Sequence, residues 1–285
     1  MFTPIIAVVS SFIDQLGSTV VKKTENKVDY PASVWESALF SMASGSIIIF
    51  AYVLFKSDLV LDAGKIWLFV PRIVLEVLQV YVTFSALKVS ELSSYNFLRV
   101  FSILFVIFFE ILFLGTVLAP VKYLGILIVF LSILIVFRRG LKNIKGWKFL
   151  LTSAINGGLL MALTKYQFSF NDPYLNEAIV RIFLVLILLG AVYFKFRNKS
   201  TEHTSLVLKH NKSLLLLIPI RAVVGLLNLV ALNFGAAAVY STADRAGSVL
   251  SGVIFGHSIF KEKSLAEKLF IAFGIIVGLV LLVLG

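Results

Sequence analysis

Some ten apolar segments, each long enough to cross a lipid bilayer, hold nearly all of the 285 residues of this chain. Hydrophobic residues make up 59% of the sequence and charged residues only 14%, with a mean hydropathy of +0.99. A water-soluble domain of this length has more charge and a mean hydropathy nearer zero. The sequence therefore predicts an all-α polytopic membrane protein without a soluble domain.

A spanning length of about 20 residues divides the chain into successive helices joined by short connections. One connection, Phe196–Lys212, is longer and rich in polar residues, which is typical of a solvated surface loop. We expect one compact bundle of ten transmembrane helices, and the predicted spans cover residues 3–21, 32–55, 66–87, 92–114, 119–137, 147–168, 175–195, 214–235, 239–260 and 265–284.

The formal net charge of +11 is distributed between the hydrophobic spans and does not form one basic face. We therefore interpret the lysines and arginines as topology signals and expect no nucleic-acid partner. Most of them follow odd-numbered spans, as Arg138, Arg139 and Lys142 do after the fifth span. The positive-inside rule puts these loops in the cytoplasm and both termini outside a membrane that we expect to be a prokaryotic cytoplasmic membrane.

The two halves of the chain, residues 1–140 and 141–285, share polar residues at corresponding positions. The corresponding pairs are Asp14 with Asn156, Lys23 with Lys165, Arg72 with Arg221, and Arg99 with Arg245. Each half contains five spans, an odd number, so the second half enters the membrane with the opposite orientation. This 5+5 inverted-topology repeat is an architecture of secondary transporters, whose substrate site lies near the midplane between the halves.

Motifs at the end of each half resemble those of the drug/metabolite transporter superfamily, specifically its ten-span EamA-type members. A small-residue corner, a span, a turn and a glycine-bearing helix follow one another twice. They read Ala86-Leu87-Lys88-Val89-Ser90, Phe113-Leu114-Gly115 and Gly125 in the first half, and Gly235-Ala236-Ala237-Ala238-Val239-Tyr240-Ser241, Ile259-Phe260-Lys261-Glu262-Lys263, Gly274 and Gly278 in the second.

The resemblance implies that spans four and nine line a central cavity and that both termini lie inside, against the charge count. It also implies basic residues at Lys23, Lys165 and Arg181, which this chain has. The chain departs from the family at the first span of each half, where the usual Trp-Gly is Asp14-Gln15 and Asn156-Gly157. Span four and span nine also lack the family's proline.

Ionisable groups inside the spans are the strongest indication of a polar pathway, since each costs several kcal/mol in hydrocarbon. Arg72, Glu76, Gln79 and Thr83 share one face of the third span by their spacing. This face either contacts a ligand or forms a structural seam in which Arg72 pairs with Glu76. The same alternative applies to the other arginines, which can pair with Glu76, Glu110 and Asp244.

Four arginines from four corresponding helices favour an anionic or zwitterionic ligand, because a guanidinium binds carboxylate and phosphate in a bidentate manner. Asp14 and Glu76 are candidates for proton coupling, and Glu36 is interpreted as a residue at a helix end that reaches toward water. The predicted substrate-binding residues are Arg72, Asn96, Arg99, Arg221, Asn228, Asp244 and Arg245.

These residues predict a secondary transporter that moves a small polar metabolite, amino-acid-like or organic-anion-like, by alternating access. No enzyme activity, cofactor or metal is expected, because the chain has no cysteine and its three histidines lack metal-ligand spacing. Two alternatives stay open: a protein that handles lipid phosphates as a flippase or enzyme, and a structural membrane subunit. The sequence does not indicate the oligomeric state.

Overall fold

A computed structural model describes residues 2–25, 33–56, 59–115, 119–137, 145–196, 215–234 and 237–284. These residues form helices, and no strand occurs among them. The helices are α1 (Phe2–Glu25), α2 (Ser33–Phe55), the short 3₁₀ helix η1 (Ala63–Leu68), α3 (Phe69–Val89), α4 (Leu92–Arg99), α5 (Phe101–Leu114), α6 (Pro120–Phe137), α7 (Trp147–Gln167), α8 (Pro173–Phe196), α10 (Leu217–Phe234), α11 (Ala237–Phe260) and α12 (Leu265–Leu284).

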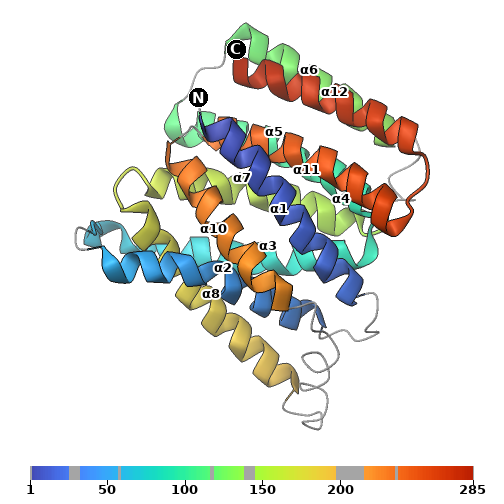
Figure 1. Cartoon of the computed structure of the whole chain (residues 1–285). Helices are drawn as coiled ribbons and strands as arrows, with labels where there is room; N and C mark the ends of the chain where they lie inside the picture. Colours follow the sequence, from blue (N-terminus) through green and yellow to red (C-terminus); the bar gives the residue numbers. More distant parts are fainter. Residues whose placement is uncertain are drawn as a thin grey trace.

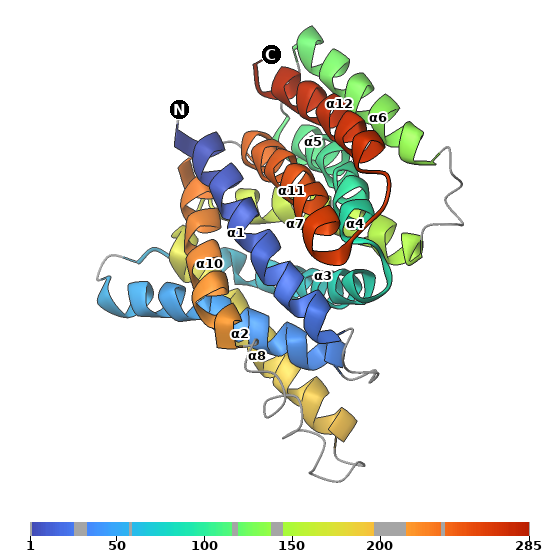
Figure 2. The same cartoon turned by 45° about the vertical axis from the view of Figure 1, so that its right-hand side comes forward.

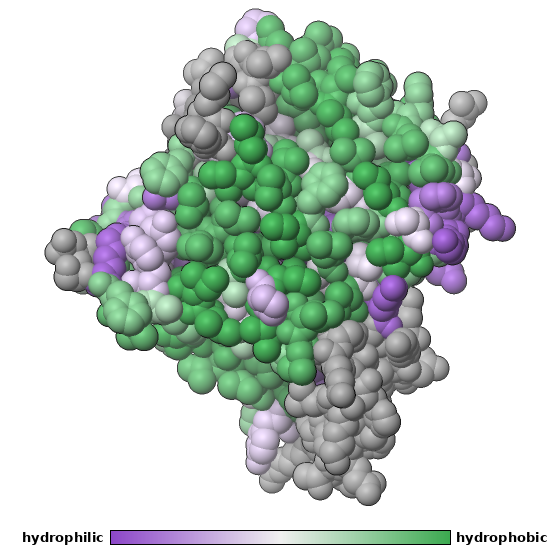
Figure 3. All heavy atoms as spheres, viewed as in Figure 1, coloured by the Kyte–Doolittle hydropathy of each residue, from purple (hydrophilic) through white to green (hydrophobic). Residues whose placement is uncertain are grey.

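All ten predicted spans are helical in the structure, with ends within a few residues of those expected. Six stretches are long and apolar enough to cross a membrane: Thr3–Lys23, Trp35–Phe55, Ala63–Val89, Leu92–Phe109, Pro173–Phe194 and Leu217–Phe234. Hydrophobic residues cover most of the face drawn in Figure 3, and hydrophilic residues gather at its left and right edges. This distribution is that of an integral membrane protein, and the crossing of the remaining helices stays a prediction.

The polar stretch expected at Phe196–Lys212 lies almost wholly outside the described residues, as do Arg138, Arg139 and Lys142. The predicted span 92–114 is not one regular helix. It divides at Val100 into α4 and α5, where the Val100 amide donates to the Phe97 carbonyl and the Ile103 amide to the Val100 carbonyl. These tighter i to i−3 bonds break the α-helical pattern beside Arg99.

Local sequence explains where several helices begin and end. Pro173 opens α8, where its missing amide hydrogen is not needed, and the Asp172 carboxylate accepts from the amides of Tyr174 and Leu175 at 2.9 and 3.1 Å. The α5 helix ends at Gly115, whose φ of 64° is the left-handed conformation that glycine adopts without strain.

The helices pack in an arrangement that repeats between the halves (Figures 1 and 2). The first-half helix α1 packs on α10 and α11 of the second half, and the second-half helix α7 packs on α3 and α5 of the first. The last helices of the two halves, α6 and α12, lie side by side at one edge of the bundle, and α8 lies toward the opposite edge. The start of α1 and the end of α12 lie at the same end of the bundle (Figure 1).

Glycine allows α2 and α10 to cross at close range in the middle of the bundle. A Cβ atom on Gly225 would lie 2.6 Å from the carbonyl oxygen of Gly45, closer than any side chain tolerates. Both glycines therefore mark a close contact between two helices. Both residues also border the cavity described next, so this crossing sets the separation of two of its walls.

Candidate binding cavity

The centre of the bundle contains a polar cavity with two adjoining lobes. The α3 lobe, of about 200 Å³, is defined by Arg72, Glu76, Gln79, Thr164 and Glu177. The α1 lobe, of about 240 Å³, is defined by Asp14, Ser41, Arg221, Asp244 and Ser248. Both lobes share a wall formed by Arg99, Met161, Arg181, Gly225, Asn228, Tyr240 and Arg245.

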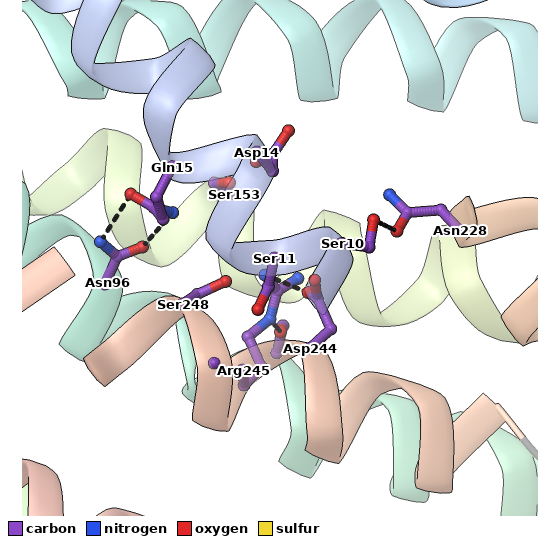
Figure 4. Close-up of polar contacts among 12 residues, drawn as sticks. Ser10, Ser11, Asp14, Gln15, Asn96, Ser153, Asn228, Asp244, Arg245 and Ser248 are labelled. Atoms are coloured by element: carbon purple, nitrogen blue, oxygen red, sulfur yellow. Dashed lines mark hydrogen bonds and ion pairs between the residues drawn. The ribbon is translucent and has the colours of Figure 1, made fainter. Parts of the chain in front are cut away.

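Eight of the nine residues predicted to bind substrate or protons line this cavity. Asn96 does not. It is buried against α1, where its amide group and that of Gln15 exchange two hydrogen bonds of 3.0 and 3.1 Å (Figure 4). A Cβ atom on Gly252 would collide with Asn96, so the amide pair fills the space between α1, α4 and α11.

Arg72 forms an ion pair with Glu177 of α8, and its guanidinium also donates to Gln167 of α7 at 2.8 Å. The predicted pairing with Glu76 on the same helix is wrong as the principal contact, because Arg72 extends across the bundle toward α8. Arg181 lies 3.7 Å from Glu177, so one carboxylate serves two arginines. Arg72 is only 1% exposed, so the contact with Glu177 offsets much of the cost of burying its charge.

Arg221 forms an ion pair with Asp14 across the contact between α10 and α1. Gly17, one turn further along α1, gives the guanidinium room, because a Cβ atom there would lie 3.1 Å from its central carbon. Ser10 donates to the Asn228 side-chain oxygen at 2.5 Å on the same two helices (Figure 4). Asp14, predicted to carry protons, thus has an arginine as its immediate partner.

Asp244 and Arg245 are neighbours on α11 and form an ion pair of 3.1 Å, which confirms the predicted pairing of arginine with Asp244. The Arg245 side chain also donates to Ser102 of α5 at 3.1 Å. Arg99 is different, since none of the acidic side chains that the structure describes lies within ion-pair distance of it. Its guanidinium lies 5.1 Å from the centre of the Tyr95 ring, on the same helix.

Sequence reasoning missed several lining residues. Glu177 was not singled out, although it stands four residues before Arg181 inside an apolar span, a spacing typical of an ion pair on one helical face. Tyr240 appeared only as part of the corner motif, and Ser41 and Met161 carry no signal that distinguishes them from ordinary packing residues.

Near the C-terminal end of the third helix of each half, a backbone carbonyl accepts a hydrogen bond from a lysine on the first helix of the same half. Lys22 donates to the Ser90 carbonyl after α3, and Lys165 donates to the Leu232 carbonyl in α10 at 3.0 Å. Lys165 was predicted to match Lys23, but Lys23 is exposed and its neighbour Lys22 makes the contact. Lysine at a helix C-terminus satisfies carbonyls that have no partner within the helix.

Glu262, in the turn between α11 and α12, holds the start of α4. Its carboxylate accepts from the Leu92 amide at 2.7 Å and from the Ser93 hydroxyl at 2.5 Å, and it lies 2.9 Å from Lys268. Burial opposes its ionisation, but the hydrogen bonds from Ser93 and Lys268 outweigh burial and hold the pKa of Glu262 below its usual value. His257, in α11, bonds to the Glu262 carbonyl.

Comparison with known proteins identifies the fold but not a family. No family model matches the chain, and no curated protein matches it. One protein of known crystal structure is similar with a TM-score of 0.65 over 99% of this chain and 96% of its own length, at 14% sequence identity. At that identity the similarity concerns the helical architecture alone.

Proposed function

We propose that this protein is a secondary transporter for a small polar metabolite, built from two inverted five-helix halves. The observation that carries the proposal is the cavity: five arginines from α3, α4, α8, α10 and α11 converge on it with four acidic residues. Such a density of charge in the middle of an apolar bundle is expensive unless it serves a pathway. The lining residues come from both halves, as alternating access between two halves requires.

Similar contacts between corresponding pairs of helices support an inverted repeat. Ser10 bonds to Asn228 between α1 and α10, and Ser153 bonds to Gln79 between α7 and α3. The lysine contacts at the ends of α3 and α10 correspond in the same way. In this arrangement ten spans cross the membrane, and residues 1–140 and 141–285 rock against each other about the central cavity. The resemblance of the sequence motifs at the end of each half to those of EamA-type transporters agrees with this mechanism.

The test is uptake by purified protein reconstituted into liposomes, after a thermal-shift screen against amino acids, organic acids, phosphorylated metabolites and lipid head groups. A ligand at 100 times its Kd stabilises the folded state by about 2.7 kcal/mol, which is readily measured. We expect a class-specific shift and saturable uptake, both abolished by Arg99→Ala and by Arg245→Ala. Lys148→Ala, at an exposed position near the start of α7, is the control that retains both.

Unchanged uptake in folded Arg99→Ala and Arg245→Ala proteins would refute the cavity as the transport site. A folded protein that responds only to lipid head groups would instead favour the lipid-handling alternative. Folding of each variant is checked by size-exclusion chromatography and thermal unfolding before uptake is measured.

A further inference from the structure

The charges around the cavity do not balance. Arg221 pairs with Asp14, and Arg245 pairs with Asp244. Arg72 and Arg181 share Glu177, and Glu76 lies one turn from Arg72 and attracts it. These groups therefore compensate one another: two single ion pairs and one cluster of two arginines with two glutamates.

Arg99 is left over. It lines both lobes, and among the described residues no carboxylate stands within ion-pair distance of it. The Tyr95 ring attracts the cation, and so do Asp244 and Asp14 from beyond ion-pair distance, but each of those carboxylates already pairs with another arginine. A positive charge inside an apolar bundle is stabilised strongly by an anion that reaches it, so the geometry places one negative charge of the ligand beside Arg99.

The residues that line the cavity also include hydrogen-bond donors without a partner. The Nε groups of Arg72 and Arg221 are buried and have no hydrogen-bond partner, one in each lobe. The Ser41 hydroxyl, 1% exposed and bordering the α1 lobe, is equally unpartnered. Asn228 accepts from Ser10 through its oxygen, and its amide nitrogen has no described partner. Acceptor oxygens of a ligand that reached these groups would satisfy them.

Resting on the transport site proposed above, we infer that the ligand is a monocarboxylate that carries further hydroxyl or carbonyl oxygens. Its carboxylate pairs with Arg99 in the shared wall, and its neutral oxygens accept from donors such as Arg72 Nε and Arg221 Nε in the two lobes. A dianion would exceed the single uncompensated charge, and a neutral polyol would leave Arg99 unpaired. A zwitterion would add an ammonium group to walls that already carry one more arginine than carboxylates.

Binding to the purified protein in detergent tests the inference with four matched probes: gluconate, glucose, succinate and serine. We expect gluconate to bind at least tenfold more tightly than glucose, which has similar hydroxyl groups but no charge, since a charge-assisted hydrogen bond is stronger than a neutral one. Gluconate should also exceed the dianion succinate and the zwitterion serine. Lys148→Gln, an exposed change outside the cavity, should preserve this order.

Two variants change the charge in opposite directions. Arg99→Gln keeps hydrogen-bonding groups but removes the charge, so gluconate and glucose should bind within about threefold of each other. Asp244→Asn releases Arg245 and adds one uncompensated positive charge, so succinate should gain at least tenfold relative to gluconate. The second variant keeps the inference testable even where Arg99→Gln lowers stability.

Tighter binding of glucose, succinate or serine than of gluconate by the wild-type protein would overturn the inference, as would the absence of any gluconate binding. An unaltered preference in Asp244→Asn would overturn the charge argument. These outcomes are distinct from failure of the proposed function. Gluconate binding without uptake by liposomes would refute transport and retain the ligand class, whereas saturable uptake of another class of compound would do the reverse.

Discussion

Two seams, each of which joins a helix of the first half to a helix of the second, differ in their chemistry. The α1–α10 seam joins Ser10 and Asp14 to Asn228 and Arg221. The α3–α7 seam joins Gln79 to Ser153 and Asn156, and Arg72 occupies the position that corresponds to Arg221. Serine bonds to an amide in both seams, but an aspartate stands on α1 where an asparagine stands on α7.

That single difference is accompanied by a change of partner. Where α1 offers a carboxylate, Arg221 pairs with it. Where α7 offers the neutral Asn156, that amide donates to Gln79 at 2.9 Å, and Arg72 pairs with Glu177 on α8. Glu36, which stands near the start of α2 as Glu177 does in α8, keeps a buried oxygen without a hydrogen-bond partner. An intramembrane arginine therefore takes its carboxylate from whichever neighbouring helix supplies one.

Of the changes to the two seams, removal of Glu177 should lower the stability of the protein most. Glu177→Ala leaves the buried Arg72 and the partly buried Arg181 without their carboxylate, and loss of one member of a buried pair costs about 3–5 kcal/mol. We expect the free energy of unfolding in detergent to fall by that amount, measured by chemical denaturation. Adding Arg72→Met to Glu177→Leu should recover most of the loss. A decrease below about 1 kcal/mol in Glu177→Ala would contradict the partner assignment.

The two helix ends that lysines contact also differ from each other in their charged neighbours. Lys22 and Lys165 make corresponding contacts, but Glu262 from the other half strengthens only the corner between α3 and α4. Glu262→Ala leaves the Leu92 amide and the Ser93 hydroxyl unpaired, and we expect a loss of about 2–3 kcal/mol by chemical denaturation. Lys263→Ala, exposed one residue further on, is the control and should change little.

The same corner should depend on pH. The pKa of Glu262 is lower in the folded protein than the ordinary value of 4.5, so its contribution to stability is complete above that value. The contribution falls as the pH drops below 4.5 and the carboxylate is protonated. Between pH 7 and pH 3, the unfolding temperature of Glu262→Gln should therefore fall less than that of the wild-type protein. An identical pH profile for wild type and variant would show that the carboxylate is not ionised in this contact.

The sequence predicted that the arginines lie close together but did not predict which acidic residues they pair with. Hydropathy predicted the helices closely because one physical quantity, the length of an apolar run, decides them. Repeat positions then predicted that Arg72, Arg99, Arg221 and Arg245 lie near a common centre, and all four line the cavity. Whether an arginine binds Asp14 or Glu177 depends on the rotation and crossing of helices far apart in the chain, which spacing along one helix does not contain.

Asn96 illustrates the same limit. Its spacing from Arg99 predicts a cavity-facing group, since residues three apart share a helical face. The paired amide of Gln15 and the close approach of Gly252 instead hold Asn96 against α1. A polar residue beside a cavity residue can thus serve the packing of three helices, and only its partner on another helix tells the two roles apart.

Asp14→Asn makes the α1–α10 seam chemically equivalent to the α3–α7 seam. We expect a smaller loss of about 1–2 kcal/mol, because Arg221 is partly exposed and, by the example of Arg72, can turn toward the acid on the neighbouring α2. If it does so, Asp14→Asn combined with Glu36→Gln should cost more than the sum of the single changes, measured as a double-mutant cycle. Additive losses would show that Arg221 does not exchange partners as Arg72 does.

The serine contacts should give the smallest effects and compare the seams most directly. Ser10→Ala removes the 2.5 Å bond to the Asn228 oxygen, for which no other side-chain donor is described, and should cost about 1 kcal/mol. Ser153→Ala should cost less, because Gln79 keeps its bonds to Thr83 and Asn156. Paired denaturation curves for the two variants measure the difference. Equal losses would mean that the remaining hydrogen bonds of Gln79 do not compensate for the loss of Ser153. The two seams would then differ in charge alone.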